Sequence, residues 1–254
     1  MTSPPGEIRL IPVRFLDEVR RGDDLVEKLR LAMRHQKKSL QDGDVLVIKH
    51  KIVSKAEAAF AQLNRVRVTA KARSWAKRYG LDPRIVTLAL RESKRIVRQK
   101  NGVLITETRH GLICANSGVD VSNVDGGRSA VLLPENPDRS AERLRSAIRK
   151  QFKVSVAVII SDSFGRPWRE GLTEVAIGVA GMKPLCDYCG RRDPEGYKLH
   201  ATVDAVADEL ASAAGLVCAK LNRTPVCIVR GFRYRKGRGS ARQLIRPANK
   251  DLFR

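Results

Sequence analysis

Residues 154–166 read Val154-Ser-Val-Ala-Val-Ile-Ile-Ser-Asp-Ser-Phe-Gly-Arg166. The apolar part, residues 154–160, is the clearest strand pattern in the chain, because a short run rich in valine and isoleucine is typical of a buried β-strand. Asp162 and Ser163 follow at once, so the pattern predicts a carboxylate and a hydroxyl at the end of that strand. Arg166 and Arg169 come next, and paired guanidinium hydrogen bonds suit a phosphate or a carboxylate.

The rest of the chain supplies further strands and helices around this segment. Asp42-Gly-Asp44 is a turn signal before an apolar run, which predicts a second buried strand. Asp82 with Pro83 predicts the start of a helix, as N-cap and first helical residue. The predicted strands cover 44–49, 103–107, 112–115, 154–160 and 225–229, and the predicted helices cover 69–78, 82–97 and 140–151, with another starting near 202. No repeat or Gly/Ser linker separates these elements, so we expect one compact α+β domain over residues 1–254, with mixed, largely antiparallel sheets and flanking helices.

Composition limits the classes of function. The 254 residues are 43% hydrophobic and 30% charged, which is typical of a globular chain and not of a disordered one. The formal net charge is +22. Residues 101–228 are nearly balanced, whereas residues 1–100 and the basic C-terminal segment 231–254 carry the excess of cations. Such a charge predicts an anionic substrate or partner and does not indicate a fold.

The cysteines and the apolar runs indicate the compartment. Five cysteines are an odd number for a disulfide framework. Cys186 and Cys189 form a single C-x-x-C motif without the further ligands of a zinc site, so plain thiols are favoured over a metal or redox site. No apolar run approaches the roughly 20 residues of a transmembrane helix, and the first residues lack a signal-peptide pattern. We therefore expect a cytoplasmic protein without a membrane partner.

A second polar stretch, residues 116–127, joins the segment after the strong strand as a candidate site. It contains Asp120, Asn123 and Asp125 among small residues, and an Asx-rich turn that bonds only its own backbone is the competing interpretation. Mg²⁺ and Mn²⁺ prefer oxygen ligands and often use one or two carboxylates with water and phosphate oxygens. Asp120, Asp162 and Ser163 suit that role, whereas surface ion pairs would equally explain Arg166 and Arg169. Walker, dinucleotide-binding and serine-elbow motifs do not occur.

The order of the motifs resembles one family, the γ-glutamyl ligases of the deazaflavin coenzyme F-420, in its single-domain form. The resemblance covers nearly the whole chain. Its segments include Asp42-Gly-Asp-Val45, Ile52-Val-Ser-Lys55-Ala-Glu57, residues 116–123, Leu132-Leu-Pro134, Ser161-Asp-Ser-Phe-Gly-Arg166 and Leu244-Ile-Arg-Pro247.

The resemblance implies a GTP-dependent ligase that joins L-glutamate to the phospholactyl side chain of the coenzyme precursor and then adds glutamates through γ-linkages. A carboxylate is a poor electrophile, so it would first be phosphorylated to an acyl phosphate, which the glutamate amine attacks. Phosphoryl transfer between anions needs cations, which are metal ions, arginine and lysine. The family relation implies Mg²⁺ or Mn²⁺, with K⁺ as an additional candidate ion, and an intertwined homodimer.

The family's functional positions carry over residue by residue. Asp120, Asp162 and Ser163 resemble its metal ligands, and Arg166 and Arg169 are the candidate catalytic arginines. The implied nucleotide-binding residues are Leu16, Asp17, Glu18, Val19, His50, Lys51, Lys55, Asn123 and Lys220. The loop at residues 16–19 is acidic where the family has an apolar loop. Lys220 stands where some members carry a metal-binding glutamate, so either the second metal is held differently or Lys220 neutralises phosphate.

Two other functions remain open. A relative of the ligase with a different acidic acceptor or nucleotide would explain the acidic loop at 16–19 and Lys220. A protein that binds nucleic acid or another polyanion on the same fold would explain the basic flanks, although the aromatic content of 5% offers few stacking platforms.

Overall fold

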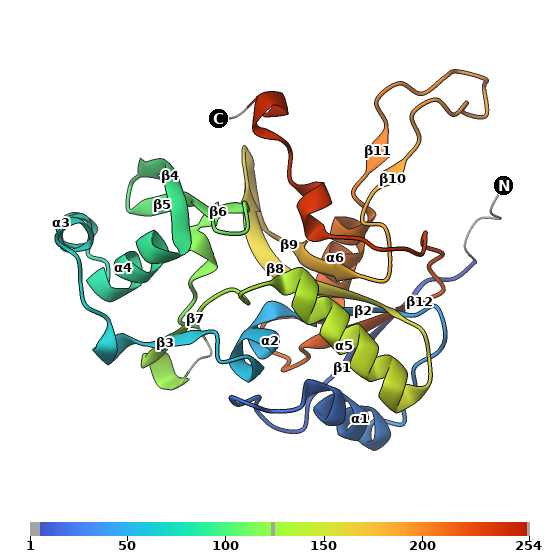
Figure 1. Cartoon of the computed structure of the whole chain (residues 1–254), viewed down its shortest axis with the longest axis horizontal. Coiled ribbons are helices and arrows are strands. Elements are labelled where there is room, and N and C mark those ends of the chain that lie inside the picture. The colour runs from blue at the N-terminus through green and yellow to red at the C-terminus, as the bar shows by residue number, and fades with distance from the viewer. Residues whose placement is uncertain (1–5, 123–124, 253–254) are drawn as a thin grey trace.

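A computed structural model describes residues 6–122 and 125–252 (Figure 1). A mixed five-stranded sheet, in the order β1-β12-β2-β8-β9, forms its centre. The β2–β8 pair is parallel, and the β1–β12, β12–β2 and β8–β9 pairs are antiparallel. These strands are β1 (Arg9–Val13), β2 (Val45–Lys49), β8 (Ala157–Arg166), β9 (Arg169–Ala180) and β12 (Val226–Arg230). The predicted α+β class with mixed, largely antiparallel sheets in one compact domain is thereby confirmed.

Helices cover both faces of this sheet. Alternate side chains of its strands point to opposite faces, so each face has apolar side chains for helices to cover. Leu46 and Ile48 of β2 pack with α1 (Leu25–His35), α2 (His50–Ala56) and α5 (Pro137–Phe152). Val45 and Val47 pack on the other face with α6 (Val206–Val217). We call these the α5 face and the α6 face; α5 crosses the front of the sheet in Figure 1.

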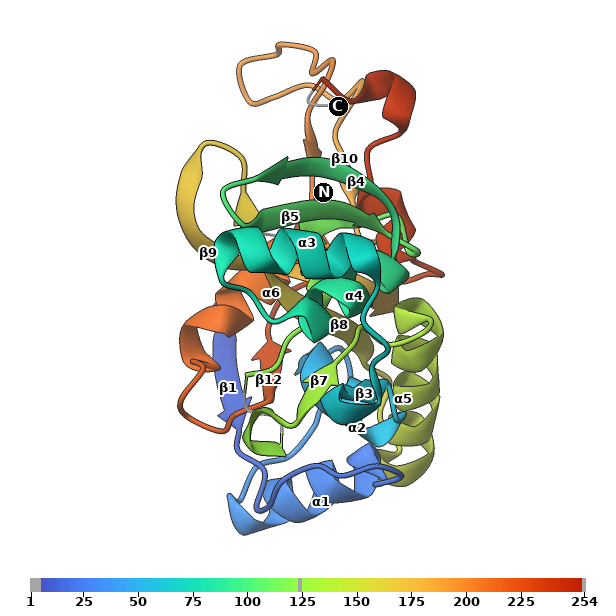
Figure 2. The ribbon, with the colours of Figure 1, turned by 90° about the vertical axis from the view of Figure 1, so that its left-hand side faces the viewer.

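A smaller lobe lies at one end of the molecule, with α3 on its outer side (Figures 1 and 2). It joins the three-stranded sheet β4-β5-β6 to two helices. Its elements are α3 (Ala70–Tyr79), α4 (Pro83–Glu92), β4 (Ser93–Lys100), β5 (Val103–Thr108) and β6 (Ile113–Ala115). The predicted N-cap Asp82 is confirmed, because it accepts from Arg84 N at 2.8 Å. Thr69, the first residue of the other predicted helix, is also an N-cap and accepts from Ala72 N at 3.2 Å.

The helix expected to run to about residue 97 is wrong in its last five residues, 93–97. Helix α4 ends at Glu92, where the Ser93 hydroxyl donates to the Leu90 carbonyl at 2.8 Å. Ile96 and Val97 then belong to β4, which pairs with β5. β-Branched residues favour a pleated surface, and the tertiary pairing with β5 outweighs the helical pattern of the surrounding cations.

Other element bounds also differ from those expected. Strand β8 continues to Arg166 because β9 pairs with its whole length. Helix α5 starts at Pro137 because Asn136, not Ser140, caps it by accepting from Arg139 N at 3.0 Å. The remaining short elements are β3 (Phe60–Gln62), β7 (Ser129–Val131), β10 (Cys186–Asp187), β11 (Val203–Asp204), and the 3-10 turns Leu63–Arg65, Asn116–Gly118, Asp125–Gly127, Ala241–Leu244 and Ala248–Lys250.

All five cysteines are free, including Cys186 and Cys189 at the base of the projecting β10–β11 hairpin. Among the described residues, no helix has both the length and the apolar character needed to cross a bilayer.

Candidate active site

The candidate site lies where β2 ends beside the middle of β8. Lys49, the last residue of β2, is the register partner of Ser161, and Asp162 is the next residue of β8. Parallel strands bring their carboxyl ends to the same edge of a sheet. Helix α2 starts directly after β2, so Lys49, His50 and Lys51 follow one another at this edge.

Asp162 is held on the α5 face of the edge. Its carboxylate oxygen Oδ1 lies 3.2 Å from Nε2 of the buried His50, and it also accepts from the Ser163 backbone N–H at 2.7 Å. Phe164, two residues further along β8, packs into the core of that same face. Asp162 is therefore fixed by two contacts, while its side chain keeps 14% of its surface exposed.

Asp120 contacts the start of the same helix, α2. Its Oδ2 lies 2.6 Å from the ammonium of Lys51, the residue after His50, and its Oδ1 accepts from Ser122 N at 2.6 Å. Burial by itself would raise the pKa of Asp120, but the hydrogen bonds from Lys51 and Ser122 outweigh it and hold this pKa below its usual range. Two carboxylates far apart in sequence are thus anchored by adjacent residues of one helix.

A tight turn delivers Asp120 to this position. The backbone takes positive φ at Asn116, Ser117 and Gly118, and Asp120 then pairs with Val131 of β7 as an isolated bridge. A Cβ at Gly118 would lie 2.8 Å from the Leu133 side chain, so this turn requires glycine. The buried Ser117 hydroxyl donates to the Ala89 carbonyl at 2.7 Å and fastens the turn to the smaller lobe.

Glu174 on β9 organises the α6 face of the same edge. It is 9% exposed, and its Oε1 lies 2.5 Å from the Lys49 ammonium. The hydroxyls of Ser161 and Ser163 donate to its two carboxylate oxygens at 2.8 and 2.6 Å. Neither Glu174 nor Lys49 was among the site residues expected from the sequence. The signal for this cluster was the Ser-x-Ser spacing of residues 161–163, which places two hydroxyls on one face of a strand.

These contacts bear on the predicted metal ligands. Asp120 and Asp162 both contact the start of α2, and Mg²⁺ commonly takes one or two carboxylates from a protein. The Ser163 hydroxyl is instead committed to Glu174 on the opposite face from Asp162. Within residues 6–122 and 125–252, no cluster of three or more His, Cys, Asp or Glu side chains could hold a metal ion. The donor set therefore fits an ion that completes its shell with water and phosphate oxygens.

Sequence similarity relates this chain to known proteins. The sequence profile of the family described as F420-0:gamma-glutamyl ligase matches residues 15–231. The chain belongs to this family.

Its relatives match it over almost their whole length. The protein named coenzyme F420:L-glutamate ligase from Methanopyrus kandleri is 44% identical over 252 residues, which cover 97% of this chain and 98% of that protein. The protein of the same name from Methanothermobacter thermautotrophicus is 42% identical and covers 97% of this chain and 99% of its own length. A third, from Methanocaldococcus jannaschii, is 44% identical over 216 residues, or 85% of this chain and 86% of that protein.

In this member of the ligase family, the predicted nucleotide residues fall into two groups. Lys55 of α2 forms an ion pair with Glu18 at 2.6 Å, so the loop at residues 16–19 lies against α2, which also carries His50 and Lys51. Asp17 pairs with Lys28 at 2.7 Å, Leu16 is exposed and Val19 is buried. Lys220 belongs to an exposed turn after α6, and Asn123 lies outside the described residues. Their nucleotide contacts stay predictions.

The two arginines lie at the end of the β8–β9 hairpin. Arg166 is the register partner of Arg169, and its guanidinium donates to the Glu170 carbonyl at 2.9 Å. Arg166 lies four positions after Asp162 along β8, and four positions of a strand span about 13 Å. The structure therefore does not bring the arginines to the carboxylates, and their catalytic role stays a prediction.

The smaller lobe also borders the site. Cys114 of β6 is buried, and burial together with the nearby charge of Asp162 raises the pKa of its thiol to about 12. A thiol with this pKa stays protonated at neutral pH and is a poor nucleophile. Cys114 therefore forms part of the wall beside Asp162 and not a reactive group.

Proposed function

We propose that this chain is a GTP-dependent ligase that joins L-glutamate to the phospholactyl side chain of the deazaflavin coenzyme precursor and then extends it by γ-linked glutamates. Membership of the family supports this assignment, and so do the printed names of relatives that match the chain over 85–97% of its length. The observation that carries it is the ladder Lys49–Glu174, His50–Asp162 and Lys51–Asp120, in which three consecutive residues each hold one acid at the sheet edge.

The ladder suits phosphoryl transfer from a nucleotide to a carboxylate. The acceptor carboxylate oxygen attacks the γ-phosphorus, the bond to the β,γ-bridging oxygen breaks, and GDP leaves. The glutamate amine then attacks the acyl carbon, loses a proton, and releases inorganic phosphate. Each step collects negative charge on neighbouring oxygens, which fixed cations stabilise.

The metal sites and the nucleotide contacts are part of the same proposal. Asp120 and Asp162 would hold Mg²⁺ or Mn²⁺, and the bound ion would neutralise phosphate oxygens during transfer. Lys51 and Lys55 lie on the same helix and, in this structure, are paired with Asp120 and Glu18. We propose that phosphate oxygens compete for these ammonium groups when the nucleotide binds. The active form is proposed to be a homodimer.

One experiment tests the proposal as a whole. The purified protein is incubated with GTP or ATP, Mg²⁺ or Mn²⁺, L-glutamate and the deazaflavin precursor, and the products are measured by mass spectrometry. We expect a mass increase of one or more glutamyl units that requires GTP and the metal. Unchanged precursor in every combination would contradict the proposed activity, and product with ATP but not GTP would contradict the proposed nucleotide.

A further inference from the structure

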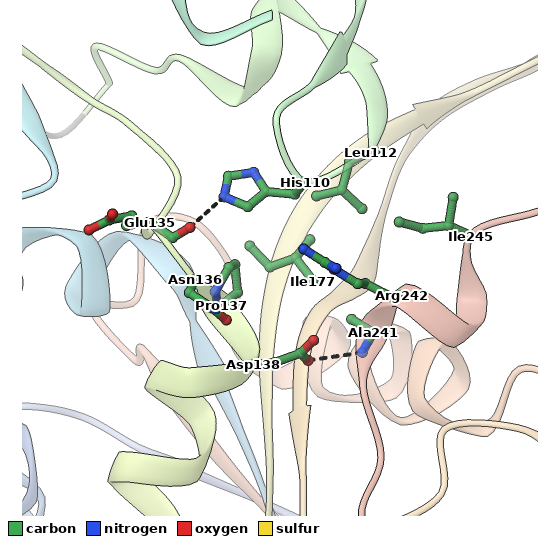
Figure 3. Close-up of a pocket in the computed structure, with 10 residues that line it drawn as sticks. All are labelled: His110, Leu112, Glu135, Asn136, Pro137, Asp138, Ile177, Ala241, Arg242 and Ile245. Atoms are coloured by element: carbon green, nitrogen blue, oxygen red, sulfur yellow. Dashed lines mark hydrogen bonds between the residues drawn. The ribbon is translucent and has the colours of Figure 1, made fainter. Parts of the chain in front are cut away.

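A basic groove of about 340 Å³ lies between the β5–β6 turn and the C-terminal segment. Arg109, His110 and Gly111 form one wall, and Arg242 and residues 245–248 form the other. A smaller cavity of about 50 Å³ adjoins it and shares His110, Arg242 and Ile245 with it. Figure 3 shows Arg242 reaching from the C-terminal segment toward His110 and Ile177 in this cavity.

The lining of the groove is strongly cationic. Lys94, Arg109, Arg242 and Arg246 line it, against one acid, Glu107. Glu107 is already engaged by Arg95 at 2.8 Å, and Arg109 is engaged by Glu92. Arg242 and Arg246 are exposed and form no ion pair with any residue in the described part of the chain. Two guanidinium groups are thus available to a phosphate, which they bind with paired hydrogen bonds.

The walls of the groove are held in place by buried contacts. Asp138 accepts from the backbone N–H of Val179 at 2.8 Å and from that of Ala241 at 2.9 Å, which fixes the residue before Arg242 onto β9. On the other side, the Ile245 side chain lies close to the turn at Gly111. A Cβ added to Gly111 would lie 3.5 Å from Ile245 Cδ1. The groove is therefore preformed, which limits the loss of entropy on binding.

His110 adds an unsatisfied polar atom to the same lining. Its Nε2 lies 3.1 Å from the Glu135 carbonyl oxygen, and because a carbonyl only accepts, Nε2 carries the hydrogen. Its Nδ1 is buried and has no hydrogen-bond partner in the described part of the chain. With the hydrogen on Nε2, Nδ1 can only accept, and a bound water would supply the donor it needs.

Two strands connect the small cavity beside the groove to the region of Asp162. Leu112, which lines the small cavity, is two residues before Cys114, whose thiol senses the charge of Asp162. Ile177, which lines the same cavity, is two residues after Val175, the register partner of Asp162. Two strand residues span about 7 Å. The small cavity, which shares His110 and Arg242 with the groove, is therefore near enough to Asp162 for one molecule to place a carboxylate at Asp162 and a neighbouring anionic group toward the groove.

We propose that the groove binds the phosphodiester of the acidic acceptor, with Arg242 and Arg246 as its specificity-determining residues. The inference rests on the proposed function, because it assigns a seat to the acceptor of that reaction. It also gives a role to part of the basic C-terminal segment, which the nucleotide and metal sites leave unexplained.

The test compares Arg242→Gln/Arg246→Gln with a matched control, Arg73→Gln/Lys77→Gln, which removes two exposed cations from α3. Binding of the deazaflavin precursor is measured by its fluorescence without nucleotide, and steady-state kinetics are measured for each substrate. We expect precursor affinity to fall, and its KM to rise, about 10-fold or more in the groove variant, with the KM for GTP unchanged. The control variant should match wild type, and circular dichroism should be unchanged in both.

Several outcomes would overturn this inference. The inference fails if the groove variant binds the precursor with wild-type affinity, or if the wild-type protein does not bind the precursor. It also fails if L-glutamate, but not inorganic phosphate, competes with the precursor for binding. The proposed function fails separately. If the wild-type protein binds the precursor through these arginines but forms no glutamyl product with any nucleotide, the groove stands and the ligase assignment does not.

Discussion

The ammonium of Lys51 lies 2.6 Å from the carboxylate of Asp120, and the preceding residue, His50, contacts Asp162 at 3.2 Å. Adjacent residues of α2 therefore hold both aspartates, although Asp162 belongs to β8, Asp120 follows the turn at residues 116–118, and the two are 42 positions apart in sequence. A single short segment after β2 thus sets the geometry of the site, and the predictions below test it.

Replacing Asp162 with asparagine should remove the charge and keep the shape of the side chain. We expect metal-dependent nucleotide turnover to fall by about 100-fold or more, since a carboxylate beside the transferring phosphoryl group is lost. The melting temperature and the circular dichroism spectrum report on the fold. Asp187→Asn, on the β10–β11 hairpin, is the matched control and should keep wild-type turnover. A fully active Asp162→Asn protein would remove Asp162 from the site.

Replacing Lys51 with methionine should shift the pH dependence of activity. Lys51 is one of the groups that hold the pKa of Asp120 below its usual range, so its removal raises that pKa. Ionised Asp120 is then lost at a higher pH, and the acid limb of the kcat/KM profile should move to higher pH. Lys71→Met on α3 should leave the profile unchanged. An acid limb in the same place for both variants would show that Asp120 does not control it.

Replacing Glu174 with glutamine should destabilise the protein, because it leaves the mostly buried ammonium of Lys49 without its counter-charge. Breaking one partner of such a pair costs about 3 kcal/mol. Urea unfolding of Glu174→Gln, Lys49→Met and the double variant measures the coupling. The double variant should be less destabilised than the sum of the single variants. Additive free energies would mean that the two side chains act independently.

Removing the cations of α3 should weaken RNA binding without changing ligase activity. Lys71, Arg73, Lys77 and Arg78 are all exposed on the smaller lobe. Changing all four to glutamine should weaken binding of a labelled RNA at low salt about 10-fold or more, because fewer counterions are released. The kinetics of glutamate ligation should stay at wild-type values. A parallel loss of ligation would place these cations in the enzymatic site and would contradict the assignment of that site to the β2–β8 edge.

Local signals in the sequence predicted much of the fold. The apolar runs before Lys49 and Asp162 predicted β2 and β8, the helix-forming residues 69–78 predicted α3, and the cap at Asp82 predicted the start of α4. The end of α4 was missed because Ser93 and Ile96 gain their strand conformation from pairing with β5, a tertiary contact without a local signal.

The candidate site was predictable only in part, for the same reason. Ser-Asp-Ser at residues 161–163 marked the end of a strand, and the family resemblance selected Asp120 as its partner. The ion pair between Lys49 and Glu174 joins residues 125 positions apart, and neither position carries a motif. The groove beside His110 depends on how the C-terminal segment docks through Asp138, which no local pattern indicates.

The most direct test of the central claim is a crystal structure with Mn²⁺ and a non-hydrolysable GTP analogue, using the anomalous signal to locate the ion. The account predicts a peak in direct coordination with carboxylate oxygens of both Asp120 and Asp162 and with oxygens of the triphosphate. Nucleotide and ion bound elsewhere, with Asp120 and Asp162 still engaged only by Lys51 and His50, would contradict it.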